Sequence, residues 1–243
     1  MSDNSLVQVK AYKKDFEYSY TLGAFPTMEL INSRPNQVMA VYVSSKFESD
    51  LDIMGICKEK GIPVIESDKT LNRISTKENC FVAGVFKKFE GTLEADKPHV
   101  LLVNVSDMGN LGTIIRTLVG LGIYDLGIVA PAADIFNPKV IRASMGAVFK
   151  MRFQVFDSFE EYEKLYGKHD MFPFMLDGEK TLSIDDRPKS DCFTLIYGNE
   201  ASGLPASFKN VGQSIFIPQS KDVDSLNLPI SVGIGAFVLT RGR

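Results

Sequence analysis

The sequence predicts an α/β protein in which strands and helices alternate along the chain. Short apolar segments rich in β-branched residues are separated by segments in which apolar side chains have helical spacing. Residues 99–105 are almost purely apolar, which is typical of a strand buried on both faces of a parallel sheet. A polar stretch over residues 91–98 contains glycine and proline and divides the chain. We therefore expect two α/β domains, residues 1–90 and 99–243, joined by a linker.

Residues 1–90 predict a small α/β sandwich. Strands are expected at residues 38–43, 63–65 and 81–86. An apolar stripe over residues 51–57 predicts a helix that ends at Gly61, because glycine is favoured just after a helix. Ser67 is placed to cap a second short helix.

Residues 99–243 predict an open, mostly parallel sheet covered by helices. Strands are expected at residues 99–105, 126–129, 153–156, 171–176, 193–197 and 214–217. Helices are expected at residues 113–121, 138–145 and 158–166, with a loop over residues 107–112 before the first of them. The last expected helix is apolar and follows a polar break at residues 224–227.

The composition argues against several classes of protein. Of the 243 residues, 44% are hydrophobic and 23% are charged, which is ordinary for a globular protein. The net charge of −3 argues against broad nucleic-acid affinity, so any RNA contact needs a local basic patch. Three widely spaced cysteines suggest neither disulfides nor a zinc site and fit a reducing cytoplasm. Because His99 and His169 are the only histidines, histidine catalysis and a histidine metal site are not expected. The apolar segments are too short for a transmembrane helix, and the N-terminal segment lacks the apolar core of a signal peptide.

Three chain breaks predict one pocket built largely from backbone. They follow the last two strands and precede the last helix, and they lie at Gly198, Pro218 and residues 224–227. Glycine lets the backbone approach a ligand closely because it has no Cβ atom. Taken singly, Gly198 is a turn residue and Ser225 is a helix cap. The prediction of a pocket depends on their combination with two earlier segments.

The first of these segments, NVSDMGNLGTIIRT at residues 104–117, follows a strand and opens a helix. Its loop amides therefore point towards a ligand at the end of the strand. The glycine spacing matches neither G-x-G-x-x-G nor the Walker loop, which argues against dinucleotide and nucleoside-triphosphate binding. The second segment, NPKVIRASMG at residues 137–146, has Lys139 and Arg142 on one helical face, where they hold a phosphate or are simply solvated.

Together the three segments resemble the SpoU-type (TrmH-like) RNA 2′-O-ribose methyltransferases of the SPOUT superfamily. The N-x-G-x-x-x-R motif of that family is matched by Asn110, Gly112 and Arg116. The second motif is matched by NPKVIRASMGA, and the third by GNEASGL, Ile217-Pro218 and Ser225-Leu226-Asn227. The resemblance spans residues 99–243, and residues 1–90 look like the ribosomal-protein-like substrate-binding domain that precedes many members. Two small departures are a methionine after Asp107, where proline is common, and Leu228 in place of the usual valine.

The resemblance implies a C-terminal α/β knot, a deep trefoil, with S-adenosyl-L-methionine bound in it and no metal. It implies that Gly198, Asn199, Ile217 and Leu226 bind the cofactor, largely through backbone. It also implies a homodimer with the pocket near the subunit interface. The expected reaction is 2′-O-ribose methylation of a structured RNA, either ribosomal or transfer RNA.

The resemblance also implies roles for individual side chains. Arg116 matches the residue credited with activating the ribose hydroxyl, but arginine is too basic to accept a proton. We expect it to bind the adjacent phosphate and stabilise the developing alkoxide. Asn110, Ser225 and Asn227 would orient Arg116 and the ribose. Glu200 would pair with Arg116 or cap the turn after Gly198, and Lys139 and Arg142 would contact RNA.

Other functions stay open on the sequence alone. A knotted enzyme of this kind could methylate a base, although the paired motifs favour ribose. The chain could instead be an RNA-binding module without catalysis, although every expected catalytic position is filled. A dinucleotide-dependent oxidoreductase is disfavoured by the glycine spacing.

Overall fold

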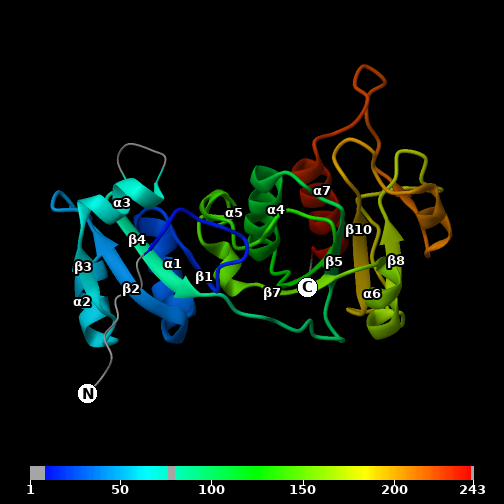
Figure 1. Cartoon of the computed structure of the whole chain (residues 1–243). Coiled ribbons are helices and arrows are strands. Elements are labelled where there is room, and N and C mark those ends of the chain that lie inside the picture. The colour runs from blue at the N-terminus through cyan, green and yellow to red at the C-terminus, as the bar shows by residue number, and fades with distance from the viewer. Residues whose placement is uncertain (1–8, 76–79, 242–243) are drawn as a thin grey trace. The chain divides into compact units, whose positions relative to one another are not determined.

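The computed structural model describes residues 9–75 and 80–241. The chain folds into two compact units, each of which combines helices with a sheet (Figure 1). The first consists of the chain before Glu90 together with Phe136–Phe149, and the second of Glu90–Ile135 together with the chain from Lys150 onward. Within the described part of the chain, no helix has the length and apolar character needed to cross a membrane.

The first unit contains a four-stranded sheet with helices on both faces. The strands lie in the order β1 (Tyr18–Tyr20), β4 (Val82–Lys87), β2 (Val38–Val43) and β3 (Val64–Glu66). Strands β2 and β3 are parallel, and the other pairings are antiparallel. The helices are α1 (Ala24–Ser33), the short η1 (Pro35–Gln37), α2 (Ile53–Glu59) and α3 (Asp68–Ile74). Ile31 of α1 and Ile53 of α2 pack on the Val41 face, whereas Leu71 of α3 packs on the Tyr42 face.

The segment Phe136–Phe149 belongs to the first unit, although its sequence lies within the range expected for the second domain. It contains α5 (Pro138–Ala143), and η2 (Ala147–Lys150) begins within it. The carbonyl of Phe136 accepts a hydrogen bond from Ser19 Oγ at 2.6 Å, and that of Phe149 accepts one from Arg34 Nε at 3.0 Å. These contacts join residues far apart in the chain, so no local pattern predicts them.

The second unit contains the open parallel sheet that the sequence predicts. Its five strands lie in the order β7 (Arg152–Phe156), β6 (Asp125–Val129), β5 (His99–Val103), β10 (Phe193–Tyr197) and β8 (Asp170–Pro173). All four pairings are parallel. Every residue of β5, β6 and β10 is buried, as expected for strands covered on both faces.

Helices cover both faces of this sheet. On one face, α4 (Met108–Gly120) packs against α7 (Leu228–Thr240), and the two lie side by side in Figure 1. On the other face, α6 (Phe159–Tyr166) and η3 (Ala206–Asn210) share one apolar cluster with Leu101 and Ile196. A separate parallel pair is formed by β9 (Lys180–Thr181) and β11 (Ile215–Phe216).

Helix α4 begins at Met108 rather than at Thr113, so the expected loop over residues 107–112 is wrong. The carboxylate of Asp107 accepts a hydrogen bond from the Asn110 N–H at 2.7 Å and thereby caps the helix. Leu111 and Gly112 are buried in the first turns. The glycines of this stretch suggest a loop, but capping and burial outweigh their low helix propensity.

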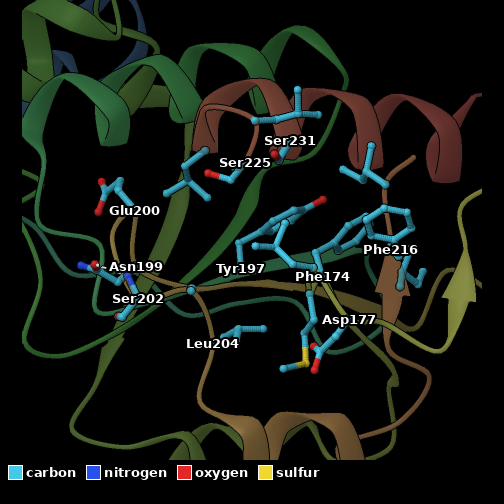
Figure 2. Close-up of a pocket in the computed structure, with 18 of the residues that line it drawn as sticks. Phe174, Asp177, Tyr197, Asn199, Glu200, Ser202, Leu204, Phe216, Ser225 and Ser231 are labelled. Atoms are coloured by element: carbon cyan, nitrogen blue, oxygen red, sulfur yellow. Dashed lines mark hydrogen bonds between the residues drawn. The ribbon is translucent and has the colours of Figure 1, made fainter. Parts of the chain in front are cut away.

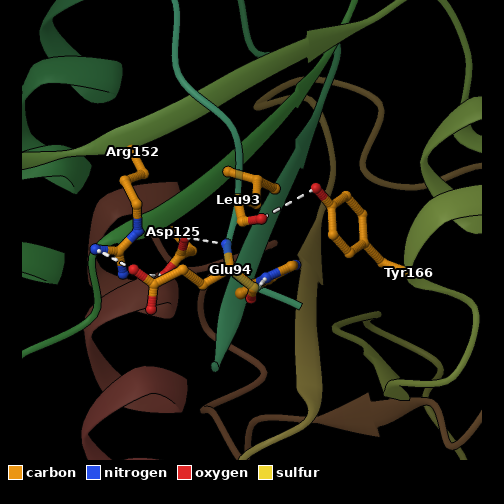
Figure 3. Close-up of polar contacts among 6 residues, drawn as sticks. Leu93, Glu94, Asp125, Arg152 and Tyr166 are labelled. Atoms are coloured by element: carbon orange, nitrogen blue, oxygen red, sulfur yellow. Dashed lines mark hydrogen bonds and ion pairs between the residues drawn. The ribbon is translucent and has the colours of Figure 1, made fainter. Parts of the chain in front are cut away.

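The expected linker lies against the second unit and is fixed there by polar contacts (Figure 3). The Arg152 guanidinium donates to both carboxylate oxygens of the buried Asp125 at 2.8 and 2.6 Å, and it also pairs with Glu94 at 3.1 Å. The Glu94 N–H donates to Asp125 at 2.9 Å, and Tyr166 Oη donates to the Leu93 carbonyl at 3.3 Å. This stretch is therefore an ordered strap rather than a free tether.

The two histidines also hold this strap. The His99 ring is 2.8 Å from the Glu94 carbonyl and 2.8 Å from Tyr162 Oη. The His169 ring is 2.9 Å from the Ala95 carbonyl, and the two ring centroids are 4.3 Å apart. Burial lowers the pKa of His99 to about 4. Both histidine rings are therefore engaged in contacts that hold the strap against the second unit.

This network makes stability depend on pH. The pKa of His99 is lower in the folded state than its ordinary 6.5, so protons bind the unfolded chain more readily than the native protein. The free energy of unfolding therefore keeps its full contribution from neutral His99 above about pH 6.5. As the pH falls towards about 4, this contribution is lost, and the free energy of unfolding decreases by roughly 3 kcal/mol in all. Urea unfolding between pH 7.5 and 4.5 should show this slope in the native protein and a smaller slope in His99→Gln. Equal slopes would rule out His99 as the source.

Candidate active site

A cavity of about 300 Å³ lies in the second unit, beside the carboxyl ends of β8 and β10 (Figure 2). Four stretches line it, drawn from residues 174–177, 197–204, 215–219 and 225–231. The cavity brings together six of the residues that the sequence singles out, namely Gly198, Asn199, Glu200, Ile217, Ser225 and Leu226. The three chain breaks therefore meet at one pocket.

Close backbone packing defines one end of the cavity. A Cβ atom on Gly198 would overlap the backbone of Gly203 and Leu204, so only glycine fits there. The Gly203 N–H donates to the Asn199 carbonyl at 2.9 Å and closes the turn. Gly203 itself has a φ of +66°, a left-handed conformation that favours glycine.

An aromatic wall forms another side of the cavity. The rings of Tyr197 and Phe174 stack with centroids 4.5 Å apart and an interplanar angle of 15°. Gly235 of α7 lets these rings approach, because a Cβ there would overlap both of them. The Tyr197 hydroxyl is buried and has no hydrogen-bond partner among the described residues, and burial raises the pKa of Tyr197 well above its usual value.

The charges that line the cavity are acidic. The described lining residues include the carboxylates Asp177 and Glu200 and no Lys, Arg or His. Lys209 forms an ion pair with Asp177, and its hydrogen bond lowers the pKa of that carboxyl below the usual value. With Asp177 paired to Lys209, Glu200 carries the remaining negative charge of the lining, which favours a ligand that carries positive charge. No sequence motif singles out Asp177 or Phe174 as site residues, although Asp177 directly follows an expected strand.

Glu200 connects the cavity to the start of α4. Its Oε1 accepts a hydrogen bond from Asn110 Nδ2 at 3.2 Å and one from the Asp107 N–H at 3.4 Å. Glu200 therefore binds the first motif through Asn110. In the described chain no ion pair joins it to Arg116, which was one of its two expected partners.

The other expected side chains lie outside the cavity lining. Arg116 is exposed on α4, and no hydrogen bond or ion pair reaches its guanidinium from the described residues. Asn227 is exposed at the N-cap of α7, where its side chain makes no capping hydrogen bond. Lys139 and Arg142 lie on α5 of the first unit, Lys139 exposed and Arg142 half-buried. Across residues 9–75 and 80–241, no three His, Cys, Asp or Glu side chains are grouped to hold a metal.

Comparison with known proteins identifies related sequences. The chain is 29% identical over 193 residues to the 23S rRNA (adenosine(1067)-2′-O)-methyltransferase of Streptomyces laurentii. The aligned stretch covers 75% of this chain and 71% of that protein. It is 28% identical over 161 residues to the 23S rRNA (guanosine(2553)-2′-O)-methyltransferase of Bacillus subtilis, with 65% and 64% covered.

Solved structures and a family model complete the comparison. The AdoMet-bound rRNA methyltransferase of Sinorhizobium meliloti matches with a TM-score of 0.74 and 25% identity, covering 91% of this chain and 86% of that one. The SpoU methyltransferase AviRb of Streptomyces viridochromogenes has the same fold, with a TM-score of 0.77, 18% identity, and 93% and 90% covered. The model of the SpoU rRNA Methylase family matches residues 97–237. The chain therefore belongs to the SpoU rRNA methylase family, as its motifs suggest.

Proposed function

We propose that this protein transfers a methyl group from S-adenosylmethionine to the 2′-hydroxyl of a ribose in a structured RNA. The observation that carries the proposal is the junction of the first and third family motifs, where Glu200 at the cavity binds Asn110 at the start of the helix that bears Arg116. The reactions named for the relatives from Streptomyces laurentii and Bacillus subtilis support the same chemistry on ribosomal RNA.

The cavity has the chemistry that this cofactor needs. S-adenosylmethionine carries a sulfonium and an ammonium group, and the lining offers the carboxylates of Asp177 and Glu200 with no cationic side chain among its described residues. The stacked rings of Phe174 and Tyr197 offer apolar surface for a purine. Backbone at Gly198, Ile217 and Leu226 would supply the polar contacts. When bound, the cofactor supplies an electrophilic methyl group.

In this proposal the residues act mainly by position and charge. Attack by the ribose oxygen in line with the sulfonium bond requires the two reactants to be held close and aligned. Arg116 would bind the phosphate beside the target ribose and stabilise the alkoxide as it forms. Asn110, fixed by Glu200, would orient the ribose together with Ser225 and Asn227.

We propose that the C-terminal chain is threaded as a trefoil knot. Phe208 of η3 packs with Tyr162 on one face of the sheet, whereas α7 packs with α4 on the other. The connecting segment pairs with β9 through β11 on its way between the faces. Close backbone packing of Gly178 against Ile215 fits a chain drawn through a tight loop. An experimental structure that traces an unthreaded segment would refute this topology.

A homodimer is proposed on the exposed face of α7. Ile230 and Phe237 are seven residues apart on this helix, so they share a face, and they are 55% and 51% exposed. A second copy of this chain would cover them and adjoin Arg116 on the neighbouring α4. Phe237→Glu should convert a dimer to a monomer in sedimentation velocity, whereas Val223→Glu, at an exposed loop residue, should leave the dimer intact. A monomeric native protein, or a dimer unaffected by Phe237→Glu, would contradict this interface.

The first unit is proposed to bind the RNA substrate. Residues 1–90 would form its main part, and Lys139 and Arg142 lie in the same unit. The three cysteines are free thiols, which supports a reducing cytoplasm as the compartment.

The function is tested by nucleoside analysis of cellular RNA. Mass spectrometry of nucleosides from cells with and without the protein should show the loss of one 2′-O-methylated nucleoside from ribosomal or transfer RNA. Loss of a base-methylated nucleoside would instead favour the base methyltransferase. An unchanged profile, together with no binding of S-adenosylmethionine, would indicate a module that only binds RNA.

A further inference from the structure

Asn199 uses its side chain to join two loops of the second unit. Its Nδ2 donates a hydrogen bond to the Asn104 carbonyl at 2.8 Å. Its Oδ1 accepts from the Ala201 N–H at 2.9 Å and from the Ser202 N–H at 3.4 Å. An amide oxygen has two lone pairs, so these two bonds saturate it. Only one N–H of the side chain is left for any ligand.

Asn104, which accepts the hydrogen bond from Asn199, has a left-handed backbone conformation. Asn104 directly follows β5 and has a φ of +58°, in the left-handed region that asparagine adopts more readily than other non-glycine residues. Its N–H donates to the Val129 carbonyl at 3.1 Å, and its own carbonyl accepts from Asn199. The amide of Asn199 therefore stabilises the turn by which the chain leaves the sheet.

Asn199 and its neighbour Glu200 together fix both ends of this turn. Asn199 holds Asn104, while Glu200 holds the Asp107 N–H and Asn110. Helix α4 starts within this stretch and carries Arg116 six residues after Asn110. A shift of the turn would thus be transmitted to the guanidinium through the helix.

We propose that Asn199 is a positioning residue, which orients the turn at residues 104–110 and so Arg116, rather than a ligand of the cofactor. The expected effect on kcat rests on the proposed function, whereas the hydrogen bonds of Asn199 do not depend on it. The sequence alone assigns Asn199 to the cofactor, because the family motif lies at the pocket. The saturated Oδ1 and the bond to Asn104 favour the positioning role.

The variant Asn199→Asp tests this role, with Asn210→Asp on η3 as a control that adds the same charge at an exposed residue. The new carboxylate still accepts from the Ala201 N–H, but it faces the Asn104 carbonyl without a proton to donate. At pH 8 we expect kcat to fall at least about tenfold, with saturating labelled S-adenosylmethionine and RNA from cells lacking the protein. The Kd for S-adenosylmethionine, measured by calorimetry without RNA, should stay within about threefold of the native value.

The pH profile provides a signature that a general loss of structure does not. A protonated carboxyl can donate to the Asn104 carbonyl, and the adjacent Glu200 raises the pKa of the introduced group. The ratio of variant to native kcat should therefore rise as the pH falls from 8 to 5.5. Asn199→Ala should lose activity without this recovery.

Three outcomes would overturn the inference. If the Kd for S-adenosylmethionine weakens as much as kcat falls, Asn199 is a cofactor ligand. If kcat is unchanged, the contact has no part in the reaction. Amide hydrogen exchange separates this inference from the proposed function, because Asn199→Asp should speed exchange at residues 104–110 even if the native protein methylates no RNA. Unchanged exchange there would overturn the positioning role directly.

Discussion

Arg116→Ala should reduce methyl transfer by at least about a hundredfold while leaving the affinity for S-adenosylmethionine within about twofold. The loss follows from removing the group that stabilises the developing alkoxide, since removal of one such donor typically costs a hundred- to a thousandfold in rate. Arg116 lies outside the cavity lining, and its guanidinium forms no hydrogen bond or ion pair with the described residues. Its replacement should therefore disturb neither the pocket nor the fold. Single-turnover transfer of labelled methyl, combined with calorimetry of cofactor binding, measures both quantities.

Arg116→Lys provides a graded comparison, because lysine keeps the charge but lacks the fork that binds phosphate through two hydrogen bonds. We expect it to recover only part of the activity. Lys164→Ala, on α6 at the opposite face of the sheet, is a control for the loss of a surface cation and should transfer methyl normally. Full transfer by Arg116→Ala would show that the guanidinium has no part in the reaction.

Gly198→Ala should weaken cofactor binding by at least about tenfold and destabilise the protein by about 1–3 kcal/mol. A Cβ at this position would overlap the backbone of Gly203 and Leu204, and backbone cannot move aside as a flexible side chain can. The turn that forms one end of the cavity must then open. Calorimetry with S-adenosylmethionine and urea unfolding measure the two effects.

Gly203→Ala is the matched comparison within the same turn. Gly203 has a φ of +66° but nothing lies within 4 Å of its Cβ position, so alanine there meets only conformational strain. We expect a destabilisation of about 1 kcal/mol and a loss of cofactor affinity below threefold. Equal effects of the two substitutions would mean that close packing at Gly198 does not shape the pocket.

Much of the parallel sheet could be predicted because its strands have a strong local signature. The buried strands β5 and β10 are apolar throughout, and the breaks that follow them mark the edge where the cavity lies. The start of α4 is not evident from the sequence, because two glycines in its first turns suggest a loop, whereas the capping hydrogen bond of Asp107 favours a helix. Strand β9 has two residues, too few to show any alternation, and is defined only by its pairing with β11, which lies within the strand expected at residues 214–217.

The motifs predict which residues lie at the site, but they do not predict the contacts that join residues far apart in the chain. The motifs named Gly198, Glu200 and Leu226, and the structure gathers them at one cavity. No spacing rule indicates that Glu200 binds Asn110, because the two are 90 residues apart. Asp177 was missed for the same reason, since its place at the cavity depends on β8 lying beside β10.

The most direct measurement of the central claim is the chemical position of the transferred methyl group. The protein is incubated with labelled S-adenosylmethionine and with ribosomal and transfer RNA from cells lacking it, and the RNA is then hydrolysed in alkali. Alkaline cleavage requires a free 2′-hydroxyl, so a ribose methylated there leaves an uncleaved dinucleotide. We predict label in alkali-resistant dinucleotides with the native protein and none with Arg116→Ala. Label confined to mononucleotides would place the methyl group on a base and contradict the account.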